Sequence, residues 1–214
     1  MEIKVCGMRE PENIRALIEQ VHPNWMGLIF YPKSPRFVSD KNIAELQNVP
    51  VRKVGVFVNA TEEEVLQKIE DFSLAAVQLH GKETPEFVQS LRQKTTAELW
   101  KVISVGSEID WNSLESYLPW VDLFLFDTAT PEHGGSGRKF DWDILKTYPF
   151  EKAFLLSGGL DVESAAEVLA LRKQIPQLQG VDLNSKFEDA PGLKNIEKLK
   201  KIKNRLIHSG TDNQ

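Results

Sequence analysis

The chain has 214 residues, of which 41% are apolar and 27% are charged, with 31 acidic residues against 26 basic ones. This composition is that of an ordinary globular protein with enough material for a sizeable core, and the net charge of −5 argues against a nucleic-acid partner. No apolar segment approaches the roughly 20 residues needed to cross a membrane, and no N-terminal signal is visible. We therefore expect a cytoplasmic protein with no membrane partner.

Eight apolar runs recur along the chain, and each is followed by room for one helix. They lie at 3–6, 26–30, 54–58, 75–80, 98–103, 123–127, 154–159 and 180–185. Continuous apolar runs are typical of buried parallel strands. Eight strand–helix units predict an α/β fold, a single-domain (β/α)8 TIM barrel, for which roughly 200 residues suffice. We expect the catalytic domain to cover 1–208, with a flexible tail over 209–214.

Helix-start signals separate these runs. The first four stand at Pro11, Ser39-Asp40, Thr61 and Thr84-Pro85, and the last four helices are expected near 110–118, near 141–147, from Asp161, and over 194–207. A doubly wound open sheet is the main rival fold. It usually carries a Gly-rich turn after the first strand, whereas the turn here reads C-G-M-R and has no dinucleotide fingerprint.

Two chemically usable side chains end strands on opposite sides of the predicted ring. Cys6 ends the first strand, and Gly7 after it allows a sharp turn that leaves the thiol at the barrel mouth. A free cysteine is otherwise more often a small buried hydrophobe. Asp127 ends the sixth strand. A thiol and a carboxyl facing each other over a small pocket can act as a base and an acid.

A phosphate site is expected behind the seventh and eighth strands, where such barrels commonly hold one on backbone N–H groups. Gly158 and Gly159 offer an approach without side chains, Asn184 and Ser185 add polar groups, and Asp182 adds an acid on the last strand. The plain alternative is that the two glycines form only a flexible turn. Two suitable loops on adjacent strands favour the phosphate interpretation.

Other loops complete the predicted mouth. Two prolines stiffen the loop at 30–37, which projects Lys33 and Arg36, and an arginine on a rigid loop suits bidentate capture of a carboxylate. The long Gly-containing segment at 128–139 has the composition of a mobile cover, or simply of disorder. His80 ends the fourth strand and is interpreted as a hydrogen-bonded pocket wall rather than a metal ligand. No metal is expected.

Seven motifs in order resemble one family. They are K-V-C-G-M-R-E-P-E-N, G-L-I-F-Y-P-K-S-P-R-F-V, K-V-G-V-F-V-N, V-Q-L-H-G, F-D-T-A-T-x-x-x-G-G-S-G-R-K-F-D-W, L-S-G-G-L and V-D-L-N-S-x-x-E-x-x-P-G-x-K. Together they resemble phosphoribosylanthranilate isomerase of tryptophan biosynthesis, over nearly the whole chain. The resemblance implies that Cys6 is the general base, that Asp127 is the general acid, and that Arg36 binds the anthranilate carboxylate. It also places the substrate phosphate on the loops of Gly158-Gly159 and Asn184-Ser185.

The implied reaction is an Amadori rearrangement of N-(5-phosphoribosyl)anthranilate to 1-(2-carboxyphenylamino)-1-deoxyribulose 5-phosphate, without metal or cofactor. Asp127 must be protonated to open the ribose ring, so the apolar run before it should raise its pKa. Cys6 must be partly thiolate. Lys186 stands where many members have glycine, so it is either strained, if that loop needs a positive φ, or an extra cation for the phosphate.

Three alternatives use the same residues. The related isomerase of histidine biosynthesis acts on two phosphates with two aspartates, but this chain has a cysteine on strand one and a single phosphate locus. A metal-dependent sugar-phosphate epimerase would need several inward ligands, and only one of the four histidines, His80, ends a strand. A non-catalytic phosphate-binding barrel would tolerate the loss of Cys6 or Asp127.

The expected partner is one small phosphorylated substrate, bound by a monomer or a homodimer.

Overall fold

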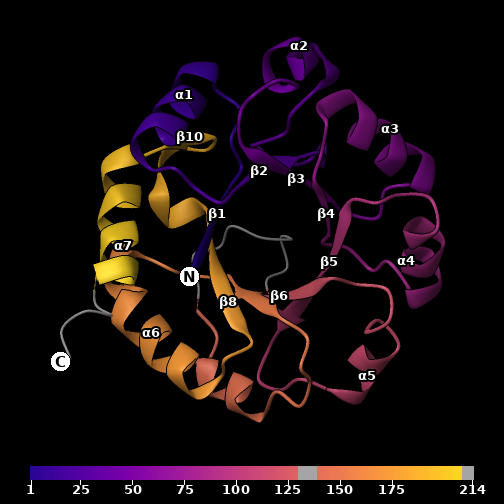
Figure 1. The fold of residues 1–214 in the computed structure, drawn as a ribbon, viewed down its shortest axis with the longest axis vertical. Coiled ribbons are helices and arrows are strands. Elements are labelled where there is room, and N and C mark those ends of the chain that lie inside the picture. The colour runs from indigo at the N-terminus through magenta and orange to yellow at the C-terminus, as the bar shows by residue number, and fades with distance from the viewer. Residues whose placement is uncertain (130–138, 209–214) are drawn as a thin grey trace.

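The computed structural model describes residues 1–129 and 139–208, which form a closed barrel inside a ring of helices (Figure 1). Eight parallel strands pair in chain order, and the last pairs with the first. The strands are β1 (Glu2–Cys6), β2 (Trp25–Ile29), β3 (Arg52–Phe57), β4 (Ala76–Leu79), β5 (Glu98–Val105), β6 (Leu123–Thr128), β7 (Phe154–Leu156) and β8 (Leu178–Leu183). The predicted TIM barrel is therefore confirmed.

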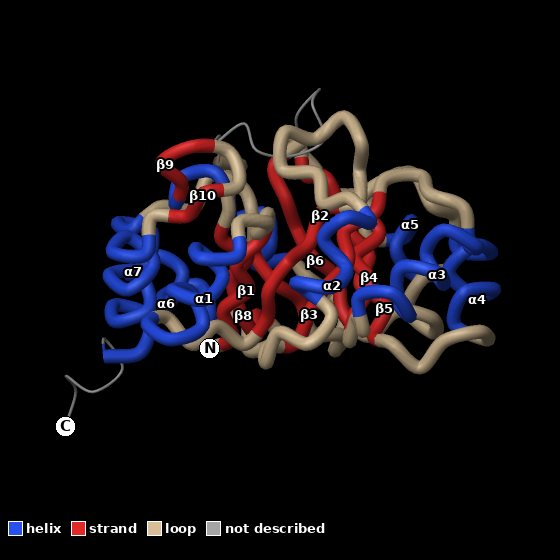
Figure 2. The backbone as a smooth tube through the Cα atoms, turned by 90° about the horizontal axis from the view of Figure 1, so that it is seen from above, coloured by secondary structure: helices blue, strands red, loops and turns tan. Residues whose placement is uncertain are grey.

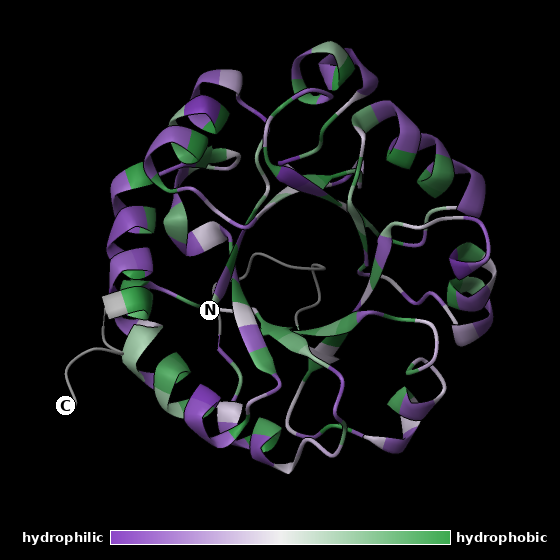
Figure 3. Ribbon diagram, viewed as in Figure 1, coloured by the Kyte–Doolittle hydropathy of each residue, from purple (hydrophilic) through white to green (hydrophobic). Residues whose placement is uncertain are grey.

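Helical segments connect the strands and cover the outside of the barrel. The α-helices are α1 (Pro11–Gln20), α2 (Ile43–Leu46), α3 (Glu62–Phe72), α4 (Pro85–Arg92), α5 (Asn112–Glu115), α6 (Ala165–Gln174) and α7 (Ile196–His208). Four 3₁₀ helices accompany them, namely η1 (Asp40–Asn42), η2 (Trp142–Thr147), η3 (Val162–Ser164) and η4 (Ser185–Phe187). Hydrophilic residues prevail on the solvent side of this ring (Figure 3). No helix among the described residues is long and apolar enough to span a membrane.

Two of the predicted helix starts, at Thr61 and Thr84, are confirmed by side-chain caps. Thr61 accepts a hydrogen bond from the Glu64 amide and forms a capping box at the start of α3. Thr84 caps α4, in which proline takes the first position. The fifth segment is shorter than expected, since α5 covers only Asn112–Glu115, and the sixth segment is the 3₁₀ helix η2.

The barrel interior changes from apolar to polar toward the carboxyl ends of the strands. At the bottom, the Trp25 and Trp100 rings meet edge to face at 4.8 Å inside a small apolar cluster. The larger core lies between the sheet and the helices. One level higher inside the barrel are three buried polar residues, Lys4, Gln78 and Asp182. This polar layer forms the floor of the site described next.

Two details at the end of the chain differ from the sequence-based expectation. The run 154–159 gives a strand of only three residues, because Gly158 and Gly159 have φ values of 85° and 68°, which no strand accommodates. A hairpin of β9 (Glu188–Ala190) and β10 (Leu193–Lys194) was not predicted, so the last helix begins at Ile196 instead of 194. Figure 2 places this hairpin at the end of the barrel opposite the end where the N-terminus lies.

Candidate active site

Cys6 lies at the mouth end of β1 and is almost fully buried, with 3% exposure. Gly27 on the neighbouring strand makes room for the thiol, since a Cβ at that position would lie 2.8 Å from Sγ. Lys4, two residues earlier on the same strand face, interacts with the thiol through its side chain. The structure therefore holds the predicted base in a tight position beside a cation.

Lys4 also forms a buried ion pair with Asp182 on the adjacent strand, at 2.9 Å between Nζ and Oδ2. Burial raises the pKa of the Cys6 thiol, and the Asp182 carboxylate raises it further. The ammonium groups of Lys4 and Lys194 act in the opposite direction and favour the thiolate. Burial has the larger effect, so the thiol is mainly neutral when the site holds no substrate.

Asp127 ends the inward face of β6 and is 8% exposed. Its Oδ1 accepts a hydrogen bond of 2.8 Å from the Thr128 amide. Burial, followed by the nearby Asp182 carboxylate, raises the pKa of Asp127 to about 6. The predicted direction of this shift is therefore confirmed, and a useful fraction of the carboxyl is protonated near neutral pH.

His80 stands beside the acid, with 3.5 Å between its Nε2 and Asp127 Oδ2. Its Nδ1 lies 3.5 Å from Nε2 of Gln78, one step lower on the strand face. Within the part of the chain that the structure describes, Gln78 Oε1 and Asp182 Oδ1 are buried acceptors without a hydrogen-bond partner. The floor of the site thus offers two acceptors for hydroxyl groups.

At Gly158 the structure shows a steric reason for glycine that differs from the predicted approach of backbone N–H groups to a phosphate. A Cβ there would lie 2.3 Å from Thr128 Oγ1 and 2.9 Å from Asp127 Oδ1, so the glycine allows the backbone to pack against the acid. The amides of Glu163 and Ser164, which open η3, already donate to the Asp161 carboxylate. These two amides are therefore engaged by an anion of the chain itself.

Asn184 and Ser185 follow β8 and begin the 3₁₀ helix η4. The first amides of such a helix have no partner within it and point toward the helix N-terminus. Lys186 lies inside η4, is exposed, and is not among the residues with positive φ. The lysine at this position therefore causes no backbone strain.

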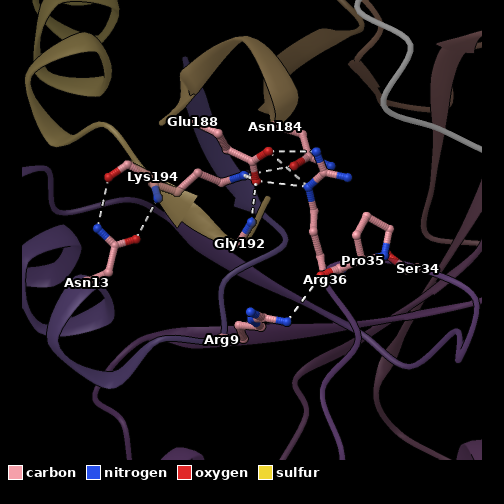
Figure 4. A network of polar contacts seen from close by, with 9 residues as sticks. All are labelled: Arg9, Asn13, Ser34, Pro35, Arg36, Asn184, Glu188, Gly192 and Lys194. Carbon is pink, nitrogen blue, oxygen red and sulfur yellow. Dashed lines mark hydrogen bonds and ion pairs between the residues drawn. The ribbon is translucent and has the colours of Figure 1, made fainter. Parts of the chain in front are cut away.

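Arg36 lies at the mouth, with its aliphatic part on the backbone of Gly7. A Cβ on Gly7 would come within 2.6 Å of Arg36 Cδ, and Gly7 has a φ of 77°. The guanidinium forms an ion pair with Glu188 on β9 (Figure 4). The hydrogen-bonded Glu188 carboxylate raises the pKa of Arg36, and a thiolate at the nearby Cys6 adds to this shift. The predicted carboxylate-binding residue is thus beside the predicted base.

Sequence reasoning missed three charged residues of this site, namely Lys4, Glu188 and Lys194. Lys4 had a readable signal, because it precedes Cys6 by two residues on a strand. The other two depend on the hairpin that was not predicted. Most of the segment at 128–139 lies outside the described residues. In the described ranges, no group of three His, Cys, Asp or Glu side chains could hold a metal ion.

Comparison with known proteins shows one consistent relationship. Residues 3–205 match the family model for N-(5'phosphoribosyl)anthranilate (PRA) isomerase. The chain is 43% identical to N-(5'-phosphoribosyl)anthranilate isomerase of Parabacteroides distasonis, covering 99% of this chain and 96% of that protein. It resembles the phosphoribosyl anthranilate isomerase structure from Thermus thermophilus with a TM-score of 0.82 at 29% identity, over 96% and 98% of the two chains.

A second solved structure is similar at a TM-score of 0.75 and 28% identity, again over 96% of this chain and 98% of the other. It is phosphoribosyl anthranilate isomerase in complex with reduced 1-(o-carboxyphenylamino)-1-deoxyribulose 5-phosphate.

Proposed function

Because this chain belongs to the N-(5'-phosphoribosyl)anthranilate isomerase family, we propose that Cys6 and Asp127 perform the proton transfers of its reaction. The protein is an aldose–ketose isomerase of tryptophan biosynthesis. The observation that carries the residue assignment is the burial of the Asp127 carboxyl at the mouth end of β6, which raises its pKa to about 6. Near pH 7 roughly a tenth of such a carboxyl is protonated, against less than a thousandth of an ordinary aspartate.

The first step is ring opening. The protonated Asp127 donates to the ribose ring oxygen, the bond from C1′ to that oxygen breaks, and an iminium forms with the anthranilate nitrogen. His80, next to the carboxyl, forms a wall of the pocket. The iminium makes the neighbouring C2′–H acidic.

The second step removes that C2′ proton. The Cys6 thiolate takes it, giving an enolamine that tautomerises to the ketone. Lys4 and Lys194 supply positive charge that favours the thiolate, whereas burial disfavours it. The other oxygen of the Asp182 carboxylate that pairs with Lys4, Oδ1, is a buried acceptor suited to bind a substrate hydroxyl.

The activity is tested by adding purified protein to N-(5-phosphoribosyl)anthranilate and following the loss of anthranilate fluorescence. The initial rate of fluorescence loss should be proportional to enzyme concentration, and one enzyme molecule should convert many substrate molecules. Adding the bisphosphorylated substrate of the related histidine isomerase should give no turnover. A protein that binds the monophosphate substrate without converting it would instead be the non-catalytic barrel considered above.

Gly159→Asp tests the phosphate site. Gly159 has a φ of 68°, which asparagine and aspartate tolerate better than other side chains. Inorganic phosphate should compete with substrate in the wild type, and this competition should disappear in the aspartate variant because a negative charge then faces the anion. Gly159→Asn carries the same strain without the charge and should retain weakened competition. Equal loss in both variants would mean that strain alone disrupts the loop.

We also propose a cytoplasmic monomer or homodimer. Among the described residues only two large apolar side chains are strongly exposed, Leu193 and Ile207. A large obligate interface is usually more apolar than this. Light scattering of the purified chain distinguishes the two assemblies.

A further inference from the structure

We propose that Glu188 is a positioning residue: it holds Arg36 so that the free edge of the guanidinium binds the substrate carboxylate. This inference rests on the proposed role of Arg36 in the isomerase reaction. The two side chains belong to segments 152 positions apart, the loop after β2 and the hairpin after β8. Their contact is therefore made only in the complete fold.

The contact is a bidentate ion pair. Arg36 Nε donates to Glu188 Oε1 at 2.9 Å, and Nη2 donates to Oε2 at 2.6 Å. The two side chains are only 11% and 5% exposed. Such paired, charge-assisted hydrogen bonds fix orientation as well as supplying energy. The plane and direction of the guanidinium are thus set before any substrate arrives.

Glu188 is itself held in place from the other side. The Gly192 amide donates to Oε1 at 3.1 Å, and Nζ of the buried Lys194 donates to the same oxygen at 2.5 Å. The result is a carboxylate surrounded by donors on both oxygens (Figure 4). A carboxylate with so many partners serves as a fixed support for Arg36, because moving it away would break several charge-assisted bonds at once.

The pairing leaves a usable edge on the arginine. A guanidinium carries five N–H groups in a fixed planar arrangement. Glu188 uses Nε and one proton of Nη2, and among the described residues none accepts a hydrogen bond from the edge formed by Nη1 and the second Nη2 proton. In Figure 4 one guanidinium nitrogen points away from Glu188 and Asn184. That edge is sufficient for bidentate binding of a second carboxylate.

The same network joins the carboxylate and phosphate ends of the site. Lys194 Nζ also donates to Asn184 Oδ1 at 2.8 Å, and Asn184 opens the loop proposed to hold the phosphate. One buried ammonium thus anchors both Glu188 and Asn184. A single buried cation therefore links the proposed carboxylate site to the proposed phosphate site.

The opposite interpretation is that Glu188 competes with substrate for Arg36. The two interpretations differ in sign: removing the charge of a competitor strengthens carboxylate binding, whereas removing a positioning residue weakens it. The test uses two ligands, reduced 1-(o-carboxyphenylamino)-1-deoxyribulose 5-phosphate and the same molecule without the ring carboxyl. The ratio of their dissociation constants isolates the carboxylate, because any general structural damage affects both ligands equally.

Calorimetric titration should give a ratio of about ten to a hundred in the wild type, as expected for one charge-assisted contact. Glu188→Gln and Glu188→Asp should each lower this ratio at least fivefold. Glu188→Asp keeps the charge, but its shorter side chain cannot support both nitrogens. Glu12→Gln, which removes the same charge from the exposed pair with Arg15 on α1, should leave the ratio unchanged.

An unchanged or increased ratio in both Glu188 variants would overturn the proposal. Failure of the underlying assignment would be recognised separately. If Arg36→Met kept the wild-type ratio, Arg36 would not bind the carboxylate at all. If Arg36 does bind the carboxylate, Arg36→Met should raise KM more than it lowers kcat. Glu188→Gln should also raise KM more than it lowers kcat, but by a smaller factor.

Discussion

Asp127→Asn is expected to lower kcat by about 10²–10⁴-fold, because an amide cannot deliver the proton that opens the ribose ring. The asparagine oxygen can still accept the hydrogen bond from the Thr128 amide, so the local backbone is preserved. The same variant should be more stable than the wild type at neutral pH. Loss of activity together with a gain in stability is the pattern that separates a catalytic acid from a structural one.

The stability gain has a defined pH dependence. The folded-state pKa of Asp127, about 6, lies above the ordinary aspartate pKa of 3.8. Ionisation is therefore less favourable in the folded state, and the wild type loses stability as the pH rises from about 4 to about 6. The full effect is at most about 3 kcal/mol, from roughly two pKa units. Asp127→Asn removes it, so the variant should match the wild type near pH 4 and exceed it above pH 6.

Urea unfolding of both proteins at pH 4 and pH 8 measures this difference, and steady-state fluorescence assays measure kcat. Turnover within tenfold of the wild type would remove Asp127 from the role of acid. A stability difference independent of pH would show that the carboxyl titrates normally in the folded protein. The two results are independent, so the role and the pKa of this residue are tested separately.

Cys6→Ser is expected to reduce kcat by about 10²–10⁴-fold, because a serine hydroxyl is far less acidic than a thiol and hardly ionises near neutral pH, even beside the ammonium groups of Lys4 and Lys194. The serine oxygen fits the space beside Gly27 and can keep the interaction with Lys4. Binding of the reduced product analogue should therefore be nearly unchanged. The variant removes the base and leaves the pocket.

Calorimetric titration and turnover of the same preparation provide the comparison. Cys6→Ala serves as the control that also removes the hydrogen-bonding group. If Cys6→Ser retained wild-type turnover, the thiol would be a packing group and the base would have to be sought elsewhere on the barrel mouth. If both variants lost analogue binding, the cysteine would be needed for the shape of the site.

The fold could be predicted because its signals are local and repeated. Each apolar run marks a buried strand, and Thr61 and Thr84 mark helix starts that the structure confirms. The misplaced boundaries have local causes that are harder to weigh. Positive φ at Gly158 ends β7 early, and the sixth segment forms the 3₁₀ helix η2 instead of an α-helix. Element type is therefore more predictable than the exact extent of each element.

The site was predicted less completely because its electrostatics depend on residues far apart in sequence. The raised pKa of Asp127 could be expected from its apolar strand. The closeness of Asp182, which adds to that shift, could not. Glu188 was visible within a recognised motif and Pro191-Gly192 is a turn signal, but the pairing of Glu188 with Arg36 requires a hairpin whose two short strands carry few apolar residues.

The Lys4–Asp182 contact lies at the seam where the first strand meets the last, and it joins residues 178 positions apart. Contacts of such separation form only when the chain is complete and the ring closes. Until then the barrel is open beside β1, so we expect Cys6 to be more accessible to solvent than its 3% exposure in the closed ring. The rate at which a thiol reagent labels Cys6 during refolding should therefore fall when the eighth strand docks. Labelling of Cys6 thus reports when the ring closes. A nascent chain that ends before β8 can hold many strands and helices and still have no active site.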